Sequence, residues 1–268
     1  MKTLTETEAV LTPEDLVAIL DVCGPEGVLV GGQALAFWAD HYQVPRPHPL
    51  VQAVSADIDF IGGSALAHKL AKALGWKPWI PGLDDATLQT GKVTLRLEDG
   101  SIKQADFLSG VLGLTTRDVI RRAIDLDVPR IGHVRVMHPI DVLESRIQNL
   151  HLIPGKRNEA GRAQARLSIA VVAAFIRDVI KTKGEKAALK LIERVADIAA
   201  ESSAVRVFLL YEIDPMAAVP IAEFRKTAAL HAKRWPQLQG YVTEQREKLR
   251  RLFARGGRGV RIQRRRTK

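Results

Sequence analysis

A change of pattern near Pro139 constrains the fold of this chain more than any other feature. Before it, short apolar runs alternate with glycine and proline, which is typical of strands and helices joined by turns. After it, apolar residues recur at helical spacing, with no run typical of a strand. The chain is therefore predicted to be α+β, with a mixed sheet and flanking helices in residues 1–138, an all-helical domain in 139–250 and a basic, flexible tail in 251–268.

The first domain is predicted to hold several short elements. Strands are expected at 27–32 and 56–61, and alternating runs on both sides of Asp99-Gly100 predict a β-hairpin over 92–108. A Pro-rich loop is expected at 43–54. The remaining expected elements are helices at 11–24, 33–42, 63–75 (capped by Ser64) and 115–126, and a short strand within 128–139.

Two aspartates one residue apart lie inside the apolar run "ADIDFI" at 56–61. On a strand, Asp57 and Asp59 point to one face, whereas Ile58 and Phe60 point to the other. Two like charges side by side repel each other, so a cation between them stabilises the pair. Mg²⁺ fits best, because it takes hard oxygen ligands and commonly keeps substrate phosphates in its shell. Such a pair also arises by chance, so it does not define a site alone.

Two other features complete a candidate site. A strand that runs into Gly31-Gly32 and then a helix leaves backbone N–H groups at the helix start, where a phosphate can bind. The alternative is a tight strand-to-helix turn with no ligand. Asp106 lies in the apolar run "QADFL" of the predicted hairpin, and aspartate is depleted in strands. It is therefore a candidate third carboxylate for the metal.

Taken together, these segments resemble a known superfamily. "VLVGGQAL" (28–35), "ADIDFI" (56–61) and "QADFL" (104–108) resemble the DNA polymerase beta-type nucleotidyltransferases. Within that superfamily, "GGQALAFW" and "DIDF" are most similar to the AbiEii/AbiGii toxins of type IV toxin–antitoxin systems, in which a helical C-terminal domain follows. The resemblance covers about the first 110 residues.

The resemblance implies an enzyme that transfers NMP from an NTP to an acceptor. Mg²⁺ or Mn²⁺ would be the cofactor, and Asp106 would also help to deprotonate the acceptor hydroxyl. Arg146 stands where the family tends to carry a lysine. The implied catalytic and metal-binding residues are Asp57, Asp59 and Asp106, and the implied nucleotide-binding residues are Gly31, Gly32, Gln33 and Arg146.

The excess positive charge is confined to the C-terminal end. Residues 246–268 contain eleven Lys or Arg and one Glu, which accounts for the whole net charge of +10. A terminal block of like charge is typical of a segment that contacts nucleic acid through phosphates. With the resemblance, it favours an RNA acceptor, tRNA in particular. Docking of an acidic partner, such as a cognate antitoxin, and a purely solubilising role stay open.

Two other functions stay open at this point. The same site could transfer a nucleotide to a protein or a small molecule, as the antibiotic-modifying members of the superfamily do. Alternatively, the chain could be a non-catalytic module that binds nucleic acid or a protein partner on this fold.

Composition and hydropathy predict a cytoplasmic location. The N-terminus lacks the apolar region of a signal peptide, and no apolar run approaches the ~20 residues of a membrane span. The single cysteine, Cys23, excludes an internal disulfide and disfavours a cysteine-based zinc site. We therefore expect no membrane partner.

Overall fold

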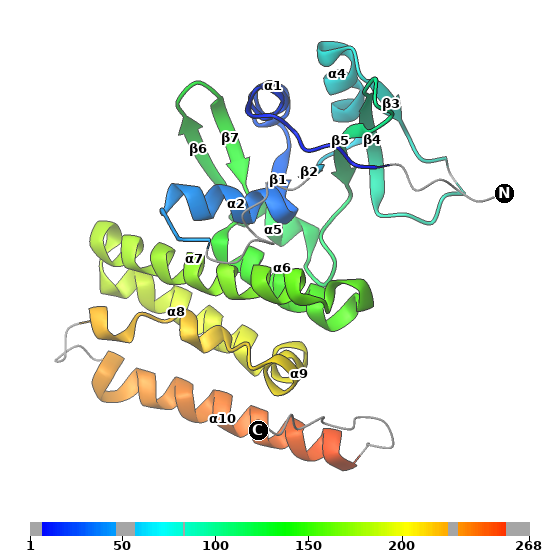
Figure 1. Cartoon of the computed structure of the whole chain (residues 1–268). Helices are drawn as coiled ribbons and strands as arrows, with labels where there is room; N and C mark the ends of the chain where they lie inside the picture. Colours follow the sequence, from blue (N-terminus) through cyan, green and yellow to red (C-terminus); the bar gives the residue numbers. More distant parts are fainter. Residues whose placement is uncertain (1–6, 47–56, 83, 225–229, 256–268) are drawn as a thin grey trace. The chain divides into compact units, whose positions relative to one another are not determined.

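The computed structural model describes residues 7–46, 57–82, 84–224 and 230–255 (Figure 1). The chain divides into two compact units, Met1–Ser145 and Arg146–Lys268, and the division falls inside helix α6 (Pro139–Leu152). The first unit contains a seven-stranded mixed sheet with helices, and the described residues of the second unit contain only helices. The fold is therefore α+β, as the sequence predicts.

The sheet of the first unit has the strand order β3-β4-β5-β2-β1-β7-β6. Strand β2 pairs in parallel with β5, whereas β1 pairs antiparallel with β2 and in parallel with β7. The β4–β5 hairpin turns at Asp99-Gly100 as predicted. The strands are β1 (Val28–Val30), β2 (Asp57–Ile61), β3 (Lys77–Trp79), β4 (Gln89–Arg96), β5 (Ile102–Leu108), β6 (Ile124–Val128) and β7 (Gly132–Val136).

Local sequence explains how the helices of this unit begin. At the first helix, Thr12 and Asp15 form a capping box, in which the Thr12 hydroxyl accepts from Asp15 N and the Asp15 carboxylate accepts from Thr12 N. At the third, Gly63 is the N-cap and Ser64 is the first helical residue, so the prediction that Ser64 caps this helix is wrong. The helices are α1 (Pro13–Cys23), α2 (Gly31–His41), α4 (Ser64–Leu74), α5 (Thr116–Arg122) and the start of α6.

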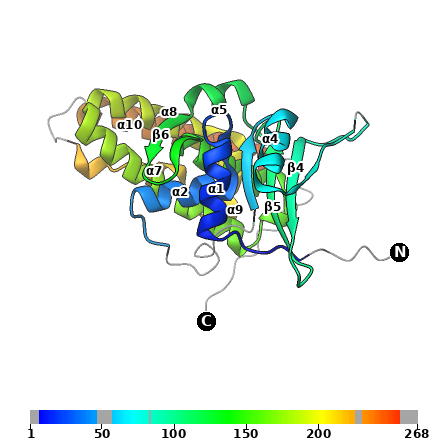
Figure 2. The ribbon, with the colours of Figure 1, turned by 90° about the horizontal axis from the view of Figure 1, so that it is seen from above.

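An apolar layer behind the central strands fixes which way their polar side chains point. Ile58 and Phe60 of β2 are almost fully buried, and the Phe60 and Phe107 rings stack with centroids 6.0 Å apart. Helix α4 packs on the β3–β5 end of the sheet (Figures 1 and 2). Side chains of a strand alternate between its two faces. Because Ile58 and Phe60 are buried on one face, Asp57 and Asp59 point to the other face.

The indole of Trp38 ties helix α2 to the end of strand β7. Its Nε1 donates a hydrogen bond of 2.8 Å to the carbonyl of Met137, and both residues are 1% exposed. A buried indole N–H needs an acceptor, so this bond fixes the direction in which α2 leaves β1.

Two strands differ from the sequence expectation. The helix expected over 115–126 ends at Arg122, and 124–128 form β6, which pairs antiparallel with β7. The apolar residues of this segment fit the spacing of a helix as well as the alternation of a strand. The segment forms a strand because β7 provides a partner for the alternating residues Ile124-Asp125-Leu126-Asp127-Val128. Strand β3 is absent from the sequence prediction. It contains Pro78 and lies at the sheet edge, where a missing N–H is tolerated.

The second unit consists of helices in its described part. Asn158 caps the longest, with its Oδ1 accepting from Gly161 N at 2.8 Å. Helix α8 contacts both α7 and α10 (Figure 1). Residues 251–255, expected to begin the tail, end helix α10, and 256–268 lie outside the described residues. Besides the end of α6, the α-helices are α7 (Glu159–Lys183), α8 (Glu185–Ala200), α9 (Ser202–Tyr211) and α10 (Trp235–Arg255), with short helical turns η1 (Pro154–Lys156), η2 (Pro215–Ala218), η3 (Ile221–Glu223) and η4 (Leu230–Arg234).

Within the described residues, none of the helices has the length and apolarity that crossing a bilayer requires.

Candidate metal and nucleotide site

Three aspartates converge on one face of the sheet. Asp57 and Asp59 lie on β2, and the parallel register places Asp106 of β5 directly beside Asp59. One oxygen of each carboxylate lies within 4.8 Å of the others. The structure thus brings together the three residues that the sequence analysis assigned to a metal.

The donor set fits a hard divalent cation. Three carboxylates offer oxygen ligands only, which suit Mg²⁺ or Mn²⁺ rather than softer metals. Three like charges this close repel one another unless a cation is present or a proton is bound. Exposed acidic groups also gather without a metal. Here Asp106 is buried and the other two are half-buried, which makes an uncompensated triad costly.

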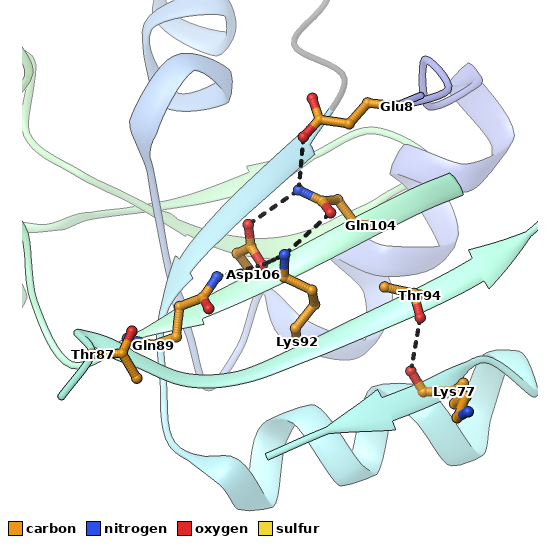
Figure 3. Close-up of polar contacts among 8 residues, drawn as sticks. All are labelled: Glu8, Lys77, Thr87, Gln89, Lys92, Thr94, Gln104 and Asp106. Atoms are coloured by element: carbon orange, nitrogen blue, oxygen red, sulfur yellow. Dashed lines mark hydrogen bonds and ion pairs between the residues drawn. The ribbon is translucent and has the colours of Figure 1, made fainter. Parts of the chain in front are cut away.

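A polar network surrounds the carboxylate of Asp106 (Figure 3). Gln89 Nε2 donates to its Oδ1 at 3.1 Å, and Gln104 Nε2 donates to its Oδ2 at 3.4 Å. The Lys92 ammonium lies 3.6 Å from Oδ1 and donates to Gln104 Oε1 at 3.4 Å. Glu8 Oε1 in turn accepts from Gln104 Nε2 at 3.5 Å. The network therefore fixes the orientation of this carboxylate.

The electrostatics of Asp106 are dominated by its burial. Burial raises the pKa of its carboxyl to about 6, the Lys92 ammonium opposes that rise, and the Asp57 charge adds to it. A carboxyl that titrates near neutral pH can exchange a proton with a substrate more readily than an ordinary aspartate. Perturbed groups of this kind are typical of functional sites, although structural networks also produce them.

A β-bulge aims two residues of β4 at the same carboxylate. Gln89 and Lys92 are three residues apart, and on a regular strand they would face opposite sides of the sheet. The register between β4 and β5 shifts between Gln89 and Gly91, and both side chains consequently reach Asp106. The bulge is the local feature that makes this network possible.

Gly31 is required by the close approach of Asp59. It is the first residue of α2 and has φ +68°, which side-chain-bearing residues rarely adopt. A Cβ atom at this position would overlap the Oδ2 atom of Asp59. The pairing of Val30 with Asp59 across β1 and β2 brings the two residues together. The start of α2 therefore lies against the carboxylate triad.

The residues assigned to nucleotide binding divide between the two units. Gly31, Gly32 and Gln33 are the first residues of α2, which has no side-chain N-cap bond, and Gln33 is buried. Backbone N–H groups in a first helical turn have no acceptor within the helix. Arg146 belongs to the second unit, where its Nη1 donates to Gln164 Oε1 at 3.2 Å. Its assignment to the nucleotide stays a prediction.

Sequence reasoning did not select Gln89, Lys92 or Gln104. Asp99 is the midpoint of the hairpin loop, so Lys92 and Asp106 lie an equal number of residues from it and are expected to pair. The structure pairs them in this way. Counting outward from the turn would therefore have found Lys92, whereas Gln89 depends on a bulge that has no sequence signature in this hairpin.

Comparisons with known proteins add little to this description. No protein-family model matches the chain, and no curated protein matches it. Among solved structures, it is similar to JHP933 from Helicobacter pylori, with a TM-score of 0.34 and 13% sequence identity over 90% of this chain and 91% of that one.

Gly31→Ala is expected to damage both stability and the site. The left-handed conformation costs a residue with a side chain roughly 1–2 kcal/mol, and the overlap with Asp59 adds to that cost. We expect the free energy of unfolding to fall by about 2 kcal/mol or more in urea denaturation. Gly155→Ala is the control, because a Cβ there meets no atom within 4 Å and the residue does not have a left-handed φ. Equal stability of the two variants would contradict the packing described.

Ionisation of Asp106 is expected to destabilise the metal-free protein. Its folded pKa of about 6 lies above the usual 3.8, so stability is complete below pH ~4 and falls as pH rises through ~6. Asp106→Asn removes this titration. In EDTA, the variant should exceed the wild type by about 2 kcal/mol in unfolding free energy near pH 8, with little difference near pH 4. A variant less stable than the wild type near pH 8 would show that its hydrogen bonds outweigh the buried charge.

Proposed function

We propose that this protein is a nucleotidyltransferase that uses Mg²⁺ or Mn²⁺ to transfer NMP from an NTP to an acceptor in the cytoplasm. The acceptor class that we favour is RNA, tRNA in particular. One observation carries the proposal: Asp57, Asp59 and Asp106 converge beside the glycine-initiated start of helix α2.

The chain's own residues suit three tasks of this chemistry. Asp57 and Asp59, with Asp106, provide the oxygen ligands for the cation. A bound divalent cation would neutralise charge on the phosphate and the attacking oxygen. The N–H groups in the first turn of α2 can bind phosphate oxygens beside the carboxylates.

Asp106 has a second role in the proposal. Its carboxylate would accept the proton of the acceptor hydroxyl as that oxygen attacks the α-phosphate and pyrophosphate leaves. The position of Asp106 beside Asp59 supports this role, because a base has to lie where the attacking oxygen would be held near the cation. Gln89 and Gln104 hold the carboxylate in one orientation during the transfer.

The resemblance to the AbiEii/AbiGii proteins supports a narrower proposal. In this version, the enzyme is the toxin of a type IV toxin–antitoxin system, RNA modification is the toxic activity, and an antitoxin protein is its partner. The positive charge of residues 246–268 supports an RNA acceptor over a small molecule.

A labelling experiment tests the activity. The protein is incubated with Mg²⁺, total RNA and each NTP in turn, radiolabelled at the α-phosphate, and label on RNA is measured. We expect label with at least one NTP, and loss of more than about 99% of it in Asp57→Asn and Asp59→Asn, because transition-state charge stabilisation is removed. Asp127→Asn is the matched control, since its carboxylate is 94% exposed and distant from the triad in the sheet order.

Three results would change the proposal. Retained labelling in Asp57→Asn would exclude this site as the catalytic centre. Label on protein or a small molecule, but not on RNA, would keep the site and replace the acceptor. Absence of label from all three acceptor classes would leave a non-catalytic binding module as the function.

A further inference from the structure

Four arginines of the second unit gather around His151 and Tyr211. Arg157 follows the turn η1, Arg162 and Arg166 lie on α7, and Arg206 lies on α9. His151 is at the end of α6, and Tyr211 ends α9. We call Arg157, Arg162, Arg166 and Arg206 the arginine cluster.

Neutral acceptors hold three of these side chains in place. Arg157 donates to the carbonyls of Leu150 at 3.1 Å and His151 at 2.6 Å. Arg162 donates to the carbonyl of Arg157 at 2.9 Å, and its guanidinium lies 5.7 Å from the centre of the Tyr211 ring. Because carbonyls and a ring carry no net charge, these contacts orient the guanidinium groups without neutralising them. Arg166 is held in the same way, donating to the Tyr211 carbonyl at 3.4 Å.

The cluster lacks the carboxylate partners that other arginines of this unit have. Over the described ranges, no ion pair with Asp or Glu is found for any of its four members. By contrast, Arg177 pairs with Glu223 at 3.1 Å, and Arg234 pairs with Glu193 at 2.6 Å. The charge of the cluster is therefore available to a ligand.

One observation indicates that this arrangement costs stability, and a second shows that the cluster makes the surroundings of His151 positive. Arg157 and Arg162 flank the N-terminal end of the 25-residue helix α7, where the helix dipole disfavours cations. The pKa of His151 is lowered by its burial and then by the charges of Arg206 and Arg157, so the cluster opposes a further positive charge at its centre. Cations gathered without carboxylate partners attract an anionic ligand.

We propose that the arginine cluster is a docking surface for the phosphate backbone of RNA. Guanidinium groups bind phosphate oxygens in a bidentate manner, and here most are held in position before binding. Arg162 and Arg166 are one helical turn apart, about 6 Å along the axis, so they can contact neighbouring phosphates of one strand. The inference rests on the proposed RNA acceptor for its role in the reaction.

RNA is favoured over an acidic protein by the distribution of charge. The cluster gathers four cations within residues 1–245, whose net charge is zero, and residues 246–268 form a second cationic region with a net charge of +10. Two cationic regions in one chain match a long polyanion better than a short acidic segment. The Tyr211 and His151 rings among the arginines are of the kind on which unpaired bases stack.

A binding experiment with two matched triple variants tests the proposal. The full chain, without NTP or divalent metal, is titrated into fluorescein-labelled bulk tRNA, and anisotropy is followed at several salt concentrations. The first variant carries Arg162→Gln, Arg166→Gln and Arg206→Gln. The control carries Arg121→Gln, Arg177→Gln and Arg234→Gln, which removes the same net charge from arginines that already pair with carboxylates and lie outside residues 246–268.

We expect the cluster variant to bind tRNA at least about tenfold more weakly, and the control less than about twofold more weakly. The slope of log K against log salt should become less steep by about 2 in the cluster variant, since each lost contact to single-stranded phosphate removes about 0.7. If tRNA binding weakens equally in both variants, net charge alone explains the loss of affinity and the proposal is overturned. The proposal is also overturned if tRNA binding weakens in neither variant. Competition by polyglutamate as strong as that by unlabelled tRNA would assign the surface to an acidic protein instead.

The same experiment separates this inference from the proposed enzyme activity. Asp57→Asn should bind tRNA like the wild type, because it leaves the cluster unchanged. Cluster-dependent tRNA binding without any transfer to RNA would overturn the enzyme proposal and leave the docking surface standing. Transfer to RNA by a cluster variant whose tRNA affinity is unaltered would overturn the docking surface and leave the enzyme proposal standing.

Discussion

Mutual repulsion among Asp57, Asp59 and Asp106 is the constraint on which the structure of the first unit depends. Their oxygens lie within 4.8 Å of one another, and the apolar side of the sheet fixes their direction. Gly31 lacks the side chain that would displace Asp59, and Lys92 supplies a nearby positive charge for Asp106. Each of these features limits a cost that the triad creates, which a protein retains for a site rather than for stability.

In both units, neutral groups hold side chains of like charge close together, and the sign of the charge differs between the units. In the first, buried carboxylates are held by strands and amide donors, and they suit a divalent cation. In the second, guanidinium groups are held by carbonyls and an aromatic ring, and they suit a polyanion. A nucleotidyltransferase that acts on RNA needs both, because it has to bind a metal–nucleotide complex and a long phosphate backbone.

The sequence predicted the parts that depend on local pattern. Period-two alternation predicted that Asp57 and Asp59 share a face, and the Asp99-Gly100 turn predicted the hairpin that carries Asp106. It did not predict the bulge that turns Gln89 toward the site, because a bulge depends on pairing between strands. Nor did it predict the arginine cluster, whose members come from three segments and gather only when the helices pack. Strand β6 was missed because its apolar residues also fit a helix.

Direct metal binding tests the central claim, that the three aspartates form a divalent-cation site. Mn²⁺ can be titrated into the metal-free protein and the free ion measured by electron paramagnetic resonance, with no nucleotide present. The account predicts that the wild type and Asp127→Asn bind Mn²⁺ alike, and that Asp57→Asn and Asp59→Asn bind it at least about tenfold more weakly. Equal binding by all four proteins, or none by the wild type, would contradict it.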